Sequence, residues 1–153
     1  MVTVTKEGSF VDDEGTNIVS LGNGNFRFCS EAMDFEPDEW PDGEERTVDI
    51  MCFAHEISFV GSQEEYDSQD NSLTDEHSLS DGTPNNCMGF HVKAIYDNTM
   101  REDGEEYFLF YGDCLGLTLE VVLPFALDGM KPREKIKVGD IVQGLFYVET
   151  RLK

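Results

Sequence analysis

Alternation of hydrophobic and polar residues predicts two strands in the second half of the chain. Hydrophobic side chains occupy every second position from Leu115 to Leu123, which predicts a strand with one face toward a core. Residues 141–152 repeat this period, and the positions predicted to face inward are Val142, Phe146, Val148 and Leu152. Gly144 lies among them, and a glycine is typical of the place where a barrel strand bends sharply.

Two hairpins are predicted by strand segments that flank turn residues. Residues 17–21 and 26–29 enclose the tetrapeptide GNGN, in which Asn-Gly readily adopts the positive φ angles of a tight turn. The second hairpin joins a strand at 90–96 to a strand at 107–111 through an acidic turn at 98–106. The residues predicted to share one face of its first strand are Phe90, Val92, Ala94 and Tyr96.

Residues 47–60 predict a long central strand that contains a β-bulge. Hydrophobic residues occupy the even positions from Val48 to Ala54, and then the odd positions Ile57 and Phe59. A change of phase within one strand indicates an inserted residue, because a shift by one position exchanges the two faces.

Two acidic segments separate the predicted strands. Residues 31–46 carry eight acids and several turn residues, which predicts a surface loop that wraps over the fold, anchored by Trp40, with one helical turn beginning at Pro37. Residues 61–86 contain too few large hydrophobic groups to offset the entropy cost of ordering them, so we expect a long mobile acidic loop. Loops of this length in a small domain are either functional or disordered.

The predicted fold is all-β, a small Greek-key barrel or sandwich with long acidic loops and at most short helical turns. Residues 89–152 resemble an OB-fold-like small β-barrel, because the element KVGDIVQG at 137–144 is similar to the turn and strand that often close such barrels. The resemblance implies architecture only, since OB-folds bind nucleic acids, sugars or proteins. A length of 153 residues predicts a single domain over residues 1–153.

The net charge of −21 is concentrated in the middle of the chain. Residues 31–85 hold 17 acids against one arginine, whereas the segments before and after carry only −2 and −3. Such a field repels phosphate backbones and anionic membrane surfaces. A locally basic strip nevertheless lies near the C-terminal end and consists of Lys131, Arg133, Lys135, Lys137, Arg151 and Lys153.

The distribution of hydrophobic residues and cysteines predicts a soluble cytoplasmic protein. No stretch approaches the ~18 apolar residues of a membrane helix, and the N-terminal residues lack the basic start and apolar core of a signal peptide. The four cysteines, Cys29, Cys52, Cys87 and Cys114, are too widely spaced for a disulfide scaffold, so we expect reduced thiols.

No motif indicates catalysis, a cofactor or a metal. The cysteines occur singly, whereas structural zinc sites use close pairs, and neither a nucleophile elbow nor a phosphate-binding loop is present. Residues 67–71 (DSQDN) lack the glycine and the distal glutamate of a calcium-binding loop. The sequence predicts a non-enzymatic protein, since an enzyme would have to assemble its site from residues without a signature.

The leading functional hypothesis is a binding module whose acidic surface engages a basic partner protein. The candidate residues of this surface are Glu36, Asp38, Glu39, Asp42, Glu44 and Glu45. Four aromatic residues are candidates for exposure on a binding face, with packing beneath loops as the alternative: Trp40, Phe108, Phe110 and Tyr147.

Three other interpretations remain open at this point. The basic C-terminal strip fits a nucleic-acid-binding OB module, although the overall acidity disfavours it. The acidic surface fits a DNA mimic that inhibits an enzyme acting on nucleic acid, which requires carboxylates spaced like phosphates on a rigid surface. High acidity also fits solubility or a salt-rich habitat without any partner.

Overall fold

A computed structural model describes residues 2–24, 27–67, 84–96, 99–100, 106–124 and 136–152. The protein is all-β, and this described part forms nine strands in one mixed sheet. The strands are β1 (Val2–Val11), β2 (Asn17–Gly22), β3 (Arg27–Ala32), β4 (Glu45–Gly61), β5 (Asn85–Ile95), β6 (Thr99–Met100), β7 (Glu106–Cys114), β8 (Leu117–Pro124) and β9 (Ile141–Leu152). The described helical elements are the 3₁₀ turn η1 (Pro37–Glu39) and the short helix α1 (Gln63–Asp67).

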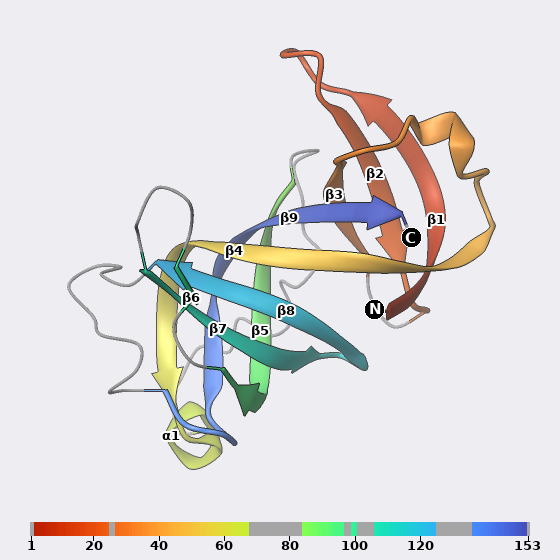
Figure 1. The fold of residues 1–153 in the computed structure, drawn as a ribbon. Coiled ribbons are helices and arrows are strands. Elements are labelled where there is room, and N and C mark those ends of the chain that lie inside the picture. The colour runs from red at the N-terminus through yellow and green to blue at the C-terminus, as the bar shows by residue number, and fades with distance from the viewer. Residues whose placement is uncertain are drawn as a thin grey trace.

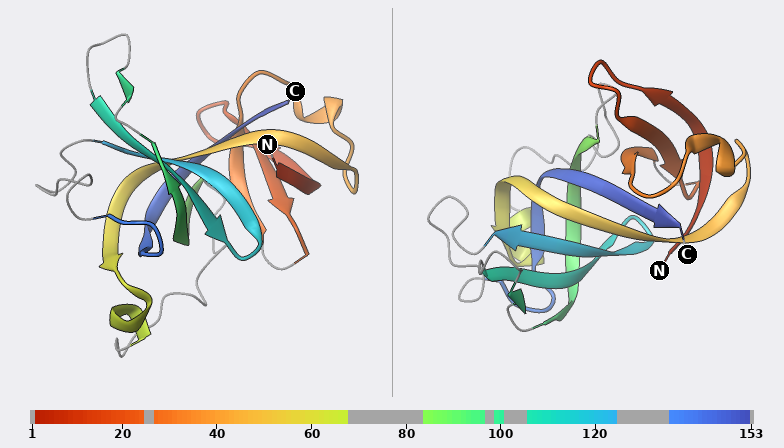
Figure 2. Two further views of the ribbon diagram at one scale, coloured as in Figure 1. Left: turned by 60° about the horizontal axis from the view of Figure 1, so that its bottom comes forward. Right: turned by 45° about the horizontal axis from the view of Figure 1, so that its top comes forward.

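The two long strands β4 and β9 form a ribbon that belongs to two closed rings of strands. They pair antiparallel from Val48↔Leu152 to Gly61↔Ile141. The order β4-β1-β2-β3-β9 closes one ring, here called the N-terminal ring, and β4-β8-β7-β5-β9 closes the C-terminal ring. Figures 1 and 2 show these two groups of strands toward opposite ends of the ribbon. The predicted small barrel is therefore observed, with three more strands built onto the same ribbon.

One hydrophobic cluster runs through both rings. Val19 and Phe28 contribute from the N-terminal ring, and Phe90, Phe110 and Phe146 from the C-terminal ring. Phe90 packs edge-on against Phe110 and Phe146, with centroid distances of 6.4 Å and 5.0 Å. Edge-to-face pairs of this kind stabilise a core beyond the effect of area burial alone.

The predicted bulge of β4 is confirmed, and it lies against Gly144 of β9. The pairing of β4 with β9 shifts register between Ala54 and Glu56 and again between Ile57 and Phe59. Gly144 pairs with Ile57 at this point. A Cβ on Gly144 would lie 2.0 Å from the Glu56 carbonyl oxygen, so the bulged backbone of β4 occupies the space that a side chain would need.

Several sequence predictions hold in the structure. The first hairpin is present as β2 and β3, and β5 pairs antiparallel with β7 as the second. The inward positions Val142, Phe146 and Val148 are fully buried, with Leu152 packed against the core, and η1 begins at Pro37.

Two predicted core positions are wrong for local reasons. Leu115 lies in a two-residue turn with Gly116, in which both φ angles are positive (48° and 97°), and its side chain is 45% exposed. The register of Cys114↔Leu117 leaves only these two residues for the turn, so β8 begins later than the hydrophobic pattern indicates. Tyr96 is exposed and packs on Tyr111, because a bulge between Val92 and Ala94 changes the phase of β5.

The limits of the predicted loops also need correction, and one long strand was missed in addition to the two-residue β6. Gly61 ends β4, α1 follows, and β5 begins at Asn85, so residues 61–86 are in part regular structure; residues 68–83 lie outside the described residues. The acidic turn at 98–106 contains β6, and the segment 125–133 is not described. The missed strand is β1, in which the core-facing positions Val2 and Val4 are followed by Lys6 at the next core-facing position. A buried lysine at a core-facing position breaks the hydrophobic pattern that would have revealed it.

Candidate functional site

The acidic segment between β3 and β4 is anchored to the N-terminal ring by aromatic residues. Trp40 is completely buried, and its indole N–H donates to the Glu44 carbonyl oxygen at 2.8 Å. Phe35 packs against it with a centroid distance of 6.3 Å. At the start of η1, the Glu36 backbone N–H donates to the Glu39 carboxylate at 2.7 Å as part of a capping box. The predicted anchoring by Trp40 is confirmed, and the segment has a defined conformation.

Lys6 connects the underside of this segment to β1. Its side chain is almost fully buried, and Nζ donates to the Pro37 carbonyl oxygen at 2.7 Å and lies 2.9 Å from Asp42 Oδ1. The Lys6 backbone N–H donates to the Glu44 carbonyl oxygen, and the Gly43 N–H donates to the Lys6 carbonyl oxygen. Lys6 therefore binds the acidic segment at two places, at Pro37 and at residues 42–44.

We expect Lys6→Met to lower the free energy of unfolding by about 1–3 kcal/mol, because the part-buried Pro37 carbonyl loses its charged donor while the hydrocarbon volume is kept. Urea denaturation followed by circular dichroism measures this change. Arg46→Met is the matched control, since Arg46 pairs with Glu44 at the surface and should contribute less than about 1 kcal/mol. Equal effects of the two substitutions would contradict an anchoring role for Lys6.

An open groove lies between this segment and the distal end of β1. Figure 1 shows η1 next to the end of β1. The lining residues come from β1, the first residue of β2 and the acidic segment: Lys6, Ser9, Phe10, Val11, Asn17, Glu36, Pro37, Asp38, Pro41 and Asp42. Phe10 and Val11 are 39% and 61% exposed. The groove therefore combines exposed hydrophobic surface with three carboxylates.

The six candidate acids are all exposed, and the structure brings half of them into the groove. Glu36, Asp38 and Asp42 line it, whereas Glu39, Glu44 and Glu45 are not among its lining residues. Glu39 is engaged in the capping box, and Glu44 accepts from Arg46 Nε at 2.6 Å. Glu36 accepts from the Asn17 side chain at 3.3 Å, and Asp42 pairs with Lys6.

The proposed exposure of the candidate aromatics is wrong for three of them. Trp40, Phe108 and Phe110 are at most 1% exposed, so the alternative of internal packing holds. Phe108 and Phe110 lie on the inward face of β7, where strand periodicity places alternate residues in the core. Tyr147 is half-buried, and its hydroxyl donates to the Glu31 carboxylate. Burial, followed by this hydrogen bond, raises the pKa of Tyr147 well above its ordinary value.

The hydrophobic and cationic members of the groove were not predicted from the sequence. The pair Phe10-Val11 directly precedes the turn residues Asp12 to Gly15, and two large hydrophobic groups at a strand end are a signal that could have been noted. Lys6 carries no such signal, because only the tertiary fold shows that it is buried.

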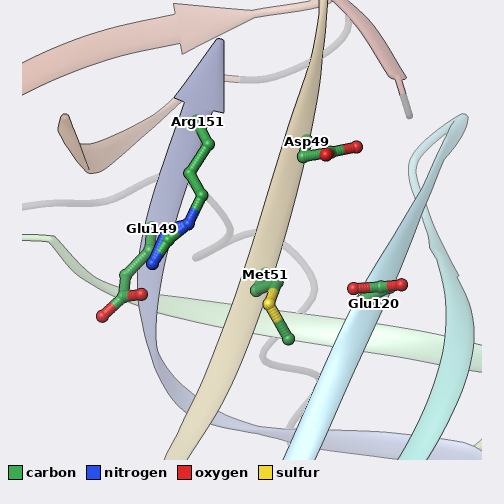
Figure 3. A pocket seen from close by; sticks show the side chains of 5 residues that line it. All are labelled: Asp49, Met51, Glu120, Glu149 and Arg151. Atoms are coloured by element: carbon green, nitrogen blue, oxygen red, sulfur yellow. The ribbon is translucent and has the colours of Figure 1, made fainter. Parts of the chain in front are cut away.

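A second, smaller hollow lies over the β4/β9 ribbon and β8. Its volume is about 130 Å³, and it is lined by Asp49, Met51, Glu120, Glu149 and Arg151. In Figure 3 the Arg151 side chain extends along β9 toward Glu149, so a cation of the chain itself already occupies this acidic surface. Tyr111 donates to Glu120 at 2.8 Å, and this hydrogen bond together with burial raises the pKa of Tyr111 to about 12.

The basic C-terminal strip is not assembled in the part of the chain that can be compared. Lys137 precedes β9 and Arg151 lies near its end, so the strand separates them by almost its full length. The remaining members, Lys131, Arg133, Lys135 and Lys153, lie outside the described residues.

In the part of the chain that the structure describes, the titratable residues that could serve catalysis or metal binding are dispersed or buried. All four cysteines are free, and burial raises the pKa of both Cys52 and Cys114, so these two thiols are protonated at neutral pH. Among the described residues, no group of three or more His, Cys, Asp or Glu side chains is arranged to hold a metal ion. His91 bonds to the Gln63 side chain at 2.8 Å.

Within the described ranges, no helix has both the length and the hydrophobicity to cross a membrane.

Comparison of the chain with models of protein families, with curated proteins and with solved structures finds no match. The groove between β1 and the acidic segment is therefore the surface on which a function can be argued.

Proposed function

We propose that this protein is a non-enzymatic binding module that engages a basic partner protein through the groove between β1 and the acidic segment. The observation that carries the proposal is the joint lining of one groove by Glu36, Asp38 and Asp42 and by exposed Phe10 and Val11. Exposed hydrophobic residues flanked by charges are typical of protein interaction sites.

Charge and anchoring both support a basic ligand. Among the residues that the structure describes, Lys6 is the single cation lining the groove. Its charge is balanced by Asp42, which leaves Glu36 and Asp38 to attract cations. The buried Trp40 and the capping box fix the segment, so its carboxylates need little ordering when a partner binds. A basic partner would also be steered toward the protein by its net charge of −21.

The proposal is tested with a synthetic peptide of alternating lysine and valine, whose binding to the full chain is followed by fluorescence anisotropy at low ionic strength. We expect Glu36→Gln combined with Asp38→Asn to weaken binding about fivefold, because each exposed charge pair contributes a few tenths of a kcal/mol to about 1 kcal/mol. The affinity of the wild type should fall as salt is added.

The matched control is Glu56→Gln combined with Glu64→Gln, which removes the same charge from exposed residues of the C-terminal ring and α1. The two double variants are compared at a salt concentration of about 0.1 M, where charges farther away than a Debye length of roughly 10 Å are screened, so binding by this control should stay within about twofold of wild type. Equal losses in both double variants would show attraction by net charge alone and would contradict a specific groove.

A single-stranded oligonucleotide provides the second arm of this experiment. If the protein is such a binding module, we expect no affinity for the oligonucleotide even at low salt, because the carboxylates repel phosphates. Tight oligonucleotide binding at low salt would instead favour a nucleic-acid-binding module that uses the basic C-terminal strip.

A further inference from the structure

The distal half of β1 has one unpaired edge. Residues Gly8 to Val11 pair with β2 on one side, from Gly8↔Ser20 to Val11↔Asn17. On the other side, β4 pairs only with Val2 to Thr5, and the backbone bonds of Lys6 to Gly43 and Glu44 end this contact. Within the described part of the chain, no strand pairs with the second edge of Gly8 to Val11.

The hydrogen-bond pattern identifies which backbone groups this edge presents. Asp12 N–H donates to the Thr16 carbonyl across the β1–β2 hairpin, and the register continues unbroken through Phe10↔Ile18. Because successive residues of an antiparallel strand direct their N–H and C=O groups to opposite sides, Phe10 bonds toward β2, and Ser9 and Val11 direct theirs away from it. Two residues thus offer a donor and an acceptor each.

The groove runs along this edge. Ser9, Phe10 and Val11 all line it, although neighbouring side chains of a strand point to opposite faces. A hollow that three consecutive residues share must border the edge of the strand and not only one of its faces. The acidic segment forms the opposite wall with Glu36, Asp38 and Asp42.

We infer that the Gly8–Val11 edge of β1 is the docking site for one extended basic segment of a partner protein, which joins the sheet as an additional strand. The inference rests on the proposed function and states how the partner is held. Main-chain bonds to Ser9 and Val11 provide the attachment, and lysine or arginine side chains of the added strand reach the carboxylates of the opposite wall.

Charge argues against a second copy of this chain as the occupant. Two copies paired edge to edge would bring two acidic segments together, and each copy carries a net charge of −21. Charges of like sign near an exposed edge are a device by which proteins prevent self-association through that edge. A basic segment is instead attracted to this edge, because its cations lie near the carboxylates of the acidic segment.

The test compares the alternating lysine–valine peptide with two N-methylated analogues, one methylated at the lysines and one at the valines. An added strand directs alternate N–H groups toward β1, so one analogue loses those bonds and the other keeps them. We expect one analogue to bind about tenfold more weakly to the wild-type chain, because it loses two main-chain hydrogen bonds, and the other to bind within about twofold of the parent peptide.

The protein side of the same bonds is tested with Ser9→Pro, which removes an outward N–H and no bond to β2, as is tolerated on an edge strand. Ser9→Ala is the control, because it keeps the N–H. We expect about tenfold weaker peptide binding by Ser9→Pro and unchanged binding by Ser9→Ala. In the wild type, hydrogen exchange of the Ser9 and Val11 amides, measured by NMR, should slow when the peptide is added. This measurement does not depend on the folding of any variant.

The outcomes separate this inference from the proposed function. If both methylated analogues bind as well as the parent peptide, and the Ser9 and Val11 amides are not protected, strand addition is overturned while charge-based binding in the groove stands. If the parent peptide itself does not bind at low salt, both are overturned. A loss confined to one analogue, with protection of the two amides, supports strand addition.

Discussion

Gly144→Ala is expected to lower the free energy of unfolding by more than about 4 kcal/mol, which is close to the total stability of many domains. The new Cβ would lie 2.0 Å from the Glu56 carbonyl oxygen and 2.9 Å from Ile57 Cα. Both are backbone atoms, so no rotamer change can relieve the contact. The two rings share the β4/β9 ribbon, and its local separation would disturb both. Urea denaturation, or the soluble yield if the variant does not fold, measures the effect.

Gly8→Ala is the control for this substitution. Gly8 also lies in a strand next to a register shift, but nothing lies within 4 Å of its added Cβ. We expect a change of less than about 1 kcal/mol, in either direction, because alanine is slightly favoured over glycine in a strand. Wild-type stability of Gly144→Ala would show that β9 does not approach the bulge of β4 as described.

Trp40→Ala is expected to cost about 3–5 kcal/mol in unfolding free energy and to abolish specific peptide binding in the groove. Trp40 is fully buried in the core and, together with Phe35 and Lys6, attaches the acidic segment to the N-terminal ring. Its loss removes the support for Glu36 and Asp38 as well as a large buried surface. Circular dichroism is the suitable probe of unfolding, because Trp40 is the single tryptophan of the chain.

Trp40→Phe distinguishes the two contributions of this residue. Phenylalanine keeps most of the hydrophobic packing but cannot donate to the Glu44 carbonyl oxygen. We expect it to cost about 1–3 kcal/mol and to retain peptide binding within a few fold. If Trp40→Ala kept the affinity of the wild type at a temperature where it is folded, the acidic segment would not need its anchor to bind.

The strands with the clearest alternation were predictable because each buries one face along its whole length. The hydrophobic phase alone located β9, most of β8 and the bulge of β4, and the Asn-Gly sequence located the turn between β2 and β3. The errors at Leu115 and Tyr96 arise where a turn or a bulge interrupts the period, and hydrophobicity alone does not mark those interruptions.

The candidate site was predictable only in part. The acids of residues 36–45 were identified from charge, and their exposure follows from the cost of burying an unpaired carboxylate. The hydrophobic wall at Phe10 and Val11 was missed because β1 was missed. Phe108 and Phe110 were proposed as exposed because sequence period indicates that two residues share a face, but not which face is covered.

By itself, the sequence determined an all-β protein with an acidic segment held by Trp40, because burial of alternate residues and the distribution of charge are local properties of the chain. Only the tertiary structure decided that β4 and β9 belong to two rings and that Lys6 is buried beneath the acidic segment. It also decided that the end of β1 has an unpaired edge beside three carboxylates. These features depend on pairing between residues far apart in sequence. Such pairing is set by the packing of the whole molecule and leaves no local pattern.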